Sequence, residues 1–223
     1  MKVRFEYYFQ RVGQISIGAF RRDFENMFAS TVFQATPEFL ALYDLDEETF
    51  LPYYVTTNFN APGRVRMEGT EFDYKQSLTF LPQWARGVQV FANMSAQRAV
   101  GDTTRSFSNY QPRTYNWGVS LSRPKFNVRM NWNYRGRRRG GFIAESPRSI
   151  EAGTYTWQSK RLYIDLSGEY NLTRRIGIFA SMRNLNDAVE DTERMGPNTP
   201  EHAQLNSRED FGGLWTFGVK GTF

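Results

Sequence analysis

Apolar and polar residues alternate with a period of two in many segments of this chain. Successive side chains of a β-strand point to opposite faces of its sheet, so this period is typical of strands. In the clearest segment, positions 126, 128, 130, 132 and 134 are aromatic or aliphatic, and only Asn and Arg stand between them. The pattern predicts a strand over residues 126–135.

Eight further segments show the same alternation, some of them more weakly. They cover residues 3–10, 14–25, 64–80, 88–100, 115–121, 162–172, 176–183 and 214–223. The sequence therefore predicts an all-β fold of about nine strands. Most of these segments are near the length of about 9–11 residues with which a tilted strand crosses a bilayer.

The last predicted strand separates its residue types most cleanly. One face carries small polar residues and Lys220, and the other face consists of Trp215, Phe217, Val219, Gly221 and Phe223. Such a strand suits lipid on one side and water on the other. Taken alone, the segment also fits a terminal edge strand of a soluble sandwich.

The faces opposite the apolar ones carry charged residues in mid-strand. A dry protein core does not accept charges without partners. We therefore expect these side chains to face the water-filled or plugged lumen of a barrel, and they are Arg4, Glu6, Asp73, Lys75, Arg129, Asp165, Glu169 and Lys220. The alternative is the solvated face of an ordinary antiparallel sheet, but the sequence offers no helix or second sheet to cover the other face.

Short and long connections between the predicted strands alternate. The chain turns tightly around residues 11–13, 81–87, 122–125 and 173–175, whereas residues 26–63, 101–112, 136–160 and 186–213 form long polar stretches. Outer-membrane barrels have tight periplasmic turns and long extracellular loops. In this order the first and last strands run in the same direction, which a closed single-chain barrel does not allow. We therefore expect an antiparallel transmembrane barrel segment, a curved open sheet if taken alone, from the C-terminal portion of a larger barrel.

Composition is compatible with strands that face lipid on one side only. The mean hydropathy is −0.59, although 16% of the residues are aromatic. Trp and Tyr gather where a membrane meets water. We expect two aromatic girdles, one at each membrane surface, from Tyr115, Trp117, Trp132, Tyr134, Phe80 and Trp84.

Residues for catalysis or metal binding are scarce. The chain has no Cys, and its one His, His202, stands in a long polar stretch. Nucleophilic triads built on these residues are therefore absent. The run Arg135–Gly141 is basic, and we expect it to contact lipopolysaccharide phosphates or to be solvated, not to bind nucleic acid. We expect no enzyme activity, no metal and no cofactor.

Three passages resemble one family of membrane proteins. Residues 68–74 with 78–82 and 88–93 are similar to a characteristic strand, turn and strand of TonB-dependent outer-membrane receptors. Residues 177–187, which contain Asn184-Leu185-Asn186, resemble the penultimate strand of those receptors, although the usual aromatic residue after Leu is missing. The last strand resembles their C-terminal strand.

The resemblance implies a complete protein with a 22-stranded barrel and an N-terminal plug domain, located in the bacterial outer membrane. Residues 1–223 would be the C-terminal portion of that barrel, without the plug and the signal peptide. Such receptors take up scarce nutrients of the siderophore, cobalamin or oligosaccharide class with energy delivered by TonB, which contacts the plug. The implied partners are outer-membrane lipid and lipopolysaccharide, the barrel-assembly machinery, TonB and the transported small molecule.

The last strand has an additional implied role. By resemblance, the face of Trp215, Phe217, Val219, Gly221 and Phe223 is the signal that the barrel-assembly machinery reads. Two other functions remain open at this point. One is a truncated smaller porin or adhesin-like barrel, and the other is a soluble β-sandwich that binds carbohydrate or nucleic acid.

Overall fold

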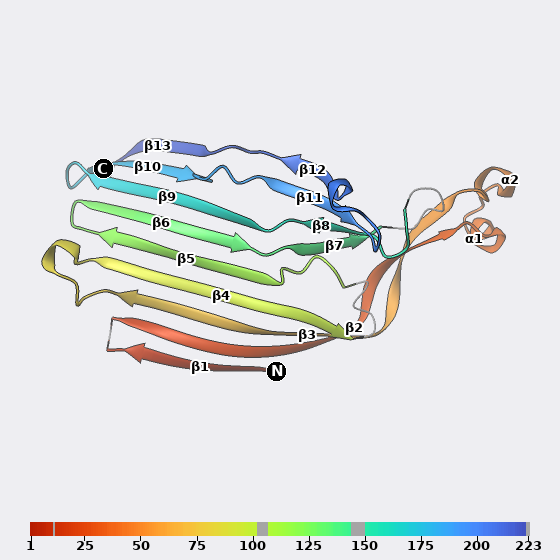
Figure 1. Ribbon diagram of the computed structural model, residues 1–223, viewed down its shortest axis with the longest axis horizontal. Coiled ribbons are helices and arrows are strands. Elements are labelled where there is room, and N and C mark those ends of the chain that lie inside the picture. Colours follow the sequence, from red (N-terminus) through yellow and green to blue (C-terminus); the bar gives the residue numbers. More distant parts are fainter. Residues whose placement is uncertain (11, 102–106, 144–149, 222–223) are drawn as a thin grey trace.

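The computed structural model describes residues 1–10, 12–101, 107–143 and 150–221 (Figure 1). Its main element is an open, curved sheet of nine antiparallel strands, in the order β1-β2-β3-β4-β5-β6-β9-β10-β13. These strands are β1 (Lys2–Phe9), β2 (Gly13–Gln34), β3 (Tyr54–Ser77), β4 (Val88–Gly101), β5 (Arg113–Ser122), β6 (Phe126–Arg135), β9 (Arg161–Asn171), β10 (Ile176–Arg183) and β13 (Leu214–Gly221). The predicted all-β class and the predicted nine strands are confirmed.

The bounds of β6 and β10 agree with the alternation of their residues, but β2 and β3 are longer than predicted. They contain 22 and 24 residues and pair with each other as far as Gln34 and Tyr54. The long connection predicted over residues 26–63 is therefore shorter in the structure and covers residues 35–53, because both of its ends belong to the strands. The register shifts between Glu25 and Met27, and Asn26 has a positive φ of 52°. A bulge of this kind inserts one residue, so it interrupts the period of two on which the prediction depended.

Two short helices connect β2 to β3 at the far end of this hairpin (Figure 1). They are α1 (Pro37–Leu42) and α2 (Glu47–Phe50). Thr36 caps α1 by accepting from the backbone N–H of Phe39 at 3.3 Å, and Asp46 caps α2 by accepting from that of Thr49 at 2.8 Å. Neither helix of the described residues is long and apolar enough to cross a membrane.

A second sheet lies within two of the stretches that were predicted to be loops. It contains β7 (Arg138–Phe142), β8 (Tyr155–Gln158), β11 (Glu190–Met195) and β12 (Leu205–Glu209), in the order β12-β11-β8-β7. These strands have four to six residues and no continuous apolar face. Their pairing depends on contacts between distant segments, which alternation along the chain does not reveal. Figure 1 shows this sheet beyond the ends of β6, β9, β10 and β13.

The short connections of the nine-stranded sheet all lie at the end opposite to the helices and the second sheet (Figure 1). They join β1 to β2, β3 to β4, β5 to β6 and β9 to β10, and one of them contains the 3₁₀ turn η1 (Gln83–Ala85). A second 3₁₀ turn, η2 (Glu201–Ala203), follows β11 and contains His202. The predicted segregation of tight turns from long connections is thus present in the fold.

Candidate functional site

The register of the nine strands places the predicted apolar residues on one face of the sheet. Directly opposite residues of antiparallel strands point to the same side. Phe5 pairs with Ile17, and Ile17 pairs with Phe72. The same relation continues without a break through Met94, Tyr115, Tyr134, Leu162 and, from β9 to β13, Leu166, Met182 and Trp215. We call this side the apolar face.

Large side chains on the apolar face are exposed instead of packed. Phe5 is 66% exposed, Val219 is 72% exposed and Phe217 is 84% exposed. Within the described residues, no second layer covers this face, because the second sheet lies beyond the strand ends (Figure 1). A soluble sandwich would bury these residues, so the geometry contradicts that alternative.

The polar face is the opposite side of the same nine strands. The register places all the predicted lumen-facing charges there: Arg4, Glu6, Asp73, Lys75, Arg129, Asp165, Glu169 and Lys220. That they face a lumen stays a prediction. Lys220 of β13 forms an ion pair with Glu169, and Asp165 accepts from the backbone N–H of Asn184 at 3.0 Å.

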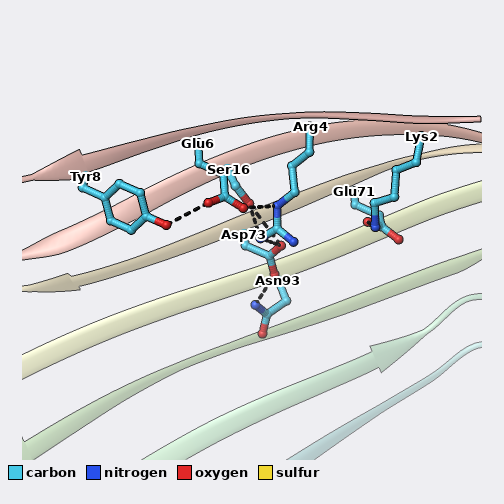
Figure 2. Close-up of polar contacts among 8 residues, drawn as sticks. All are labelled: Lys2, Arg4, Glu6, Tyr8, Ser16, Glu71, Asp73 and Asn93. Atoms are coloured by element: carbon cyan, nitrogen blue, oxygen red, sulfur yellow. Dashed lines mark hydrogen bonds and ion pairs between the residues drawn. The ribbon is translucent and has the colours of Figure 1, made fainter.

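A continuous network joins the polar residues of β1 to β4 (Figure 2). Arg4 is at its centre: its Nε lies 2.8 Å from Glu6, and its Nη2 donates to the Ser16 hydroxyl at 3.0 Å and lies 3.5 Å from Asp73. Asp73 also accepts from Ser16 at 3.3 Å and from Asn93 at 2.7 Å. Each charge therefore has an opposite charge or a hydrogen-bond donor next to it, as a partly desolvated wall requires.

The Tyr8 hydroxyl extends this network, and a separate ion pair lies beside it. Lys2 lies 2.6 Å from Glu71, and the Tyr8 hydroxyl donates to Glu6 at 2.7 Å (Figure 2). Beside it, a hollow of about 310 Å³ is lined mainly by Glu71, Asp73, Asn93, Ser95, Thr114 and Asn116. These groups offer hydrogen bonds of both kinds. They suit contact with water, with a polar ligand or with a polar polypeptide surface.

Sequence reasoning missed a reversal of polarity along β2, β3 and β4. Beyond Ala19 and Thr70, the side of the apolar face carries charged residues in place of apolar ones. Arg66 lies 3.0 Å from Asp23, and Arg98 of β4 lies 2.6 Å from Glu68. We call these residues the ion-pair ladder, which comprises Arg21, Asp23, Glu25, Arg64, Arg66, Glu68 and Arg98.

The polar face reverses at the same level. Phe20, Val65 and Met67 lie there and are buried. Phe24 contacts Phe107 with ring centroids 5.2 Å apart. The change is visible in the sequence itself, because the apolar positions shift by one residue at Ala19-Phe20 and the charged positions Arg21 and Asp23 then follow.

The residues predicted to form aromatic girdles lie near opposite ends of the sheet. Tyr115 stacks on Tyr134 with ring centroids 5.4 Å apart, and Trp117 stacks on Trp132 with centroids 6.1 Å apart. All four belong to the apolar face of β5 and β6. Phe80 and Trp84 lie in the connection between β3 and β4 and are exposed. The membrane-surface role of both groups stays a prediction.

The predicted assembly signal occupies the apolar face of β13. Trp215, Phe217, Val219 and Gly221 pair with Met182, Ala180, Ile178 and Ile176 of β10. Phe223 lies outside the described residues. The recognition role of this strand stays a prediction.

The basic run from Arg135 to Gly141 passes from β6 into β7. Arg137 lies over the Trp157 ring at 5.0 Å from its centroid and forms an ion pair with Glu193. Arg139 lies over the Tyr155 ring at 4.7 Å. These contacts hold the run against β8 and β11. The positive charges of Arg137 and Arg139 are therefore stabilised by aromatic rings and, for Arg137, by a carboxylate.

One pair in the second sheet predicts a pH effect. Arg208 donates from Nε and Nη2 to the two carboxylate oxygens of Asp191, at 2.7 and 2.8 Å. These hydrogen bonds lower the pKa of Asp191. Because the pKa of Asp191 is lower in the folded state than in the unfolded state, its ionised carboxylate stabilises the pairing of β11 with β12 at pH values above the ordinary Asp pKa of about 3.9. This stabilisation is lost as the pH falls through the folded-state pKa.

We therefore expect Arg208→Gln to raise the pKa of Asp191 and to weaken amide hydrogen-exchange protection in β11 and β12 at neutral pH. The loss of protection on acidification that we expect of the native protein should become smaller in this variant. Ser207→Ala is the control, because Ser207 is adjacent to Arg208 but contributes no charge. Equal titration of Asp191 in both variants would contradict the assignment.

Comparison with known proteins agrees with this geometry. A family model described as TonB dependent receptor-like, beta-barrel matches residues 3–185. A search of curated protein sequences gave no match. Two solved structures have the same fold at 17% sequence identity: P. aeruginosa FpvA bound to the iron complex of a heterologous pyoverdine, with a TM-score of 0.60, and FpvAI in complex with pyocin S2, with a TM-score of 0.61. Each covers 99% of this chain, whereas this chain spans only 27% and 26% of those proteins.

Proposed function

Since the chain belongs to the TonB-dependent receptor-like β-barrel family, whose members are receptors and transporters and not enzymes, we propose that it forms part of the wall of an outer-membrane receptor for a scarce nutrient. Uptake would be driven by energy delivered through TonB. The observation that carries the proposal is the division of one sheet into an exposed apolar face and a polar face with paired charges.

We propose that each side of this wall has a separate task. The apolar face contacts the hydrocarbon of the outer membrane, where exposed Phe217 and Val219 are stable. The polar face lines the lumen. Its network around Arg4 and Asp73 contacts water, the transported molecule or a plug domain that closes the barrel.

Residues 1–223 are assigned to the C-terminal portion of one barrel domain. The share of about a quarter that this chain covers in the two FpvA structures supports a portion of a longer barrel, and the resemblance of its last strand to the C-terminal strand of the family supports the C-terminal position. The plug, which TonB contacts in this family, would lie in another part of the receptor. The strand of Trp215 and Phe217 would be read by the barrel-assembly machinery, and lipopolysaccharide would contact the long-connection end.

The proposed ligand class is a metal–siderophore complex, with cobalamin or an oligosaccharide as the other members of the nutrient class. Support comes from FpvA, which was solved with an iron–pyoverdine complex, although 17% identity relates the folds only. The hydrogen-bonding groups of the polar face suit a ligand rich in polar atoms. A smaller passive porin is the alternative function, and it differs from a receptor because its uptake needs no energy delivered through TonB.

Uptake by intact cells tests the proposal. Deletion of the gene in its own host should abolish high-affinity uptake of radiolabelled iron from at least one ferric siderophore in a panel that includes ferric pyoverdine. A protonophore should stop the same uptake in cells that carry the gene, because TonB depends on the inner-membrane proton gradient. Uptake that depends on the gene but resists the protonophore would identify a passive porin and reject the proposal.

A further inference from the structure

In its described connections, the short-connection end of the sheet carries positive charge only. The described residues of its connections are 10 and 12, 78–87, 123–125 and 172–175, and Figure 1 shows these connections side by side at one end. Among their described residues there is no Asp or Glu, whereas the basic residues are Arg86, Arg123, Lys125, Arg174 and Arg175. We call this set the basic rim.

Carboxylates do not neutralise the basic rim. Within the described part of the chain, no ion pair of 4.0 Å or less joins any of its residues to an acidic side chain. At the opposite end, Arg137 pairs with Glu193, Arg161 with Glu190 and Arg208 with Asp191. The positive charge of the rim is therefore available to an anionic partner.

Exposed aromatic residues stand among these cations. Phe80 is 74% exposed and Trp84 is 82% exposed. Arg123 fixes their turn by donating to the backbone carbonyls of Gln83 and Trp84. Leu172, in the connection between β9 and β10, and Ile176, the first residue of β10, are also exposed. Apolar, aromatic and cationic groups thus occur together at the rim, as they do where a protein passes from hydrocarbon to lipid headgroups.

We propose that the basic rim binds the phosphate groups of anionic phospholipids in the membrane leaflet at the short-connection end. The inference rests on the proposed location in the outer membrane and adds a lipid site to it. Negative lipid surfaces attract Lys and Arg side chains held near them, and each side chain contributes separately. Trp84 and Phe80 would anchor in the same interfacial layer.

An acidic polypeptide is the competing occupant. A groove of about 640 Å³ at the rim is lined by Lys125, Arg174, Arg175 and Lys220, together with Glu169, Leu172 and Ile176. A peptide bound there would use the cations but would leave Phe80 and Trp84 in water. The combination of cationic and aromatic groups therefore favours lipid.

Fluorescence quenching by brominated lipids tests the proposal. The protein purified from outer membranes is placed in vesicles of phosphatidylcholine and phosphatidylglycerol, with one lipid brominated at a time, and the Trp84 signal is obtained by difference from Trp84→Phe. We expect phosphatidylglycerol to be preferred at Trp84 by about tenfold or more. The double variant Arg86→Gln/Lys125→Gln should lose most of this preference. Arg86→Lys/Lys125→Arg, which keeps both charges, and Lys160→Gln/Arg194→Gln, which removes two charges elsewhere, should retain it.

Each other outcome overturns the inference in a distinct way. Equal quenching by the two brominated lipids, or a preference that survives in Arg86→Gln/Lys125→Gln, removes the lipid site and leaves the membrane location intact. Displacement of phosphatidylglycerol from the rim by hexaglutamate at micromolar concentration assigns the rim to an acidic polypeptide. Absence of quenching by either lipid removes Trp84 from the bilayer surface, and it contradicts the proposed membrane location as well.

Discussion

Ala180→Arg should lower the free energy of unfolding of the membrane-embedded protein by about 2–4 kcal/mol, as an Arg near the bilayer midplane on a lipid-facing strand does. Ala180 is in the middle of β10, and its neighbours on the apolar face are Gly168 and Phe217. The new guanidinium would have no polar partner in hydrocarbon. Urea unfolding in phospholipid vesicles, followed by tryptophan fluorescence, measures the change.

Ser181→Arg is the matched control. Ser181 is the next residue of the same strand, but it lies on the polar face between Ser167 and Thr216. An Arg there reaches an environment that already contains charges, so we expect a cost below about 1 kcal/mol. Equal effects of the two substitutions would mean that neither face touches lipid.

Gly87→Val should destabilise the folded protein by about 2–5 kcal/mol, since a strained backbone and a steric overlap add together. Gly87 has a φ of +90°, and a Cβ built there would lie 2.2 Å from the carbonyl oxygen of Ser122. The same residue accepts from the Ser122 N–H at 3.1 Å, so the two backbones cannot separate without losing this hydrogen bond. The unfolding midpoint in urea is the measurement.

Gly141→Val serves as the comparison for this substitution. A Cβ at Gly141 has no atom within 4 Å. We expect its free energy of unfolding to stay within about 1 kcal/mol of the native value. A Gly87→Val protein as stable as Gly141→Val would show that the turns at the basic rim can rearrange freely.

Local alternation predicted the nine strands of the main sheet, but not their partners and not the four short strands of the second sheet. The sequence pattern located β6 and β10 to the residue, because each has an unbroken period of two. It failed at Asn26, where a bulge shifts the period, and in β7, β8, β11 and β12, whose stability comes from pairing between distant segments. The sequence also does not reveal that β6 pairs with β9 and β10 with β13 across intervening hairpins.

The candidate site shows the same limit. The type of residue in each polar position placed Arg4 and Asp73 on one side of the sheet, and the register agrees with this. Their contact could not be predicted, because β2 separates their strands and its register decides which residues meet. The ion-pair ladder was missed for another reason. Its charges lie on the same side of β2, β3 and β4 as the apolar residues that are nearer the short connections.

The ion-pair ladder limits how deeply the sheet can lie in the outer membrane, where we propose that it is located. Outward side chains change from Ile17 and Ala19 to Arg21 and Asp23 within a few residues, and each residue advances a strand by about 3.3 Å. Sinking by two residues would immerse Arg21, Glu68 and Arg98 in acyl chains, and rising by two would expose Ile17 and Phe72 to headgroups and water. The ion-pair ladder therefore fixes the depth of the wall along the membrane normal.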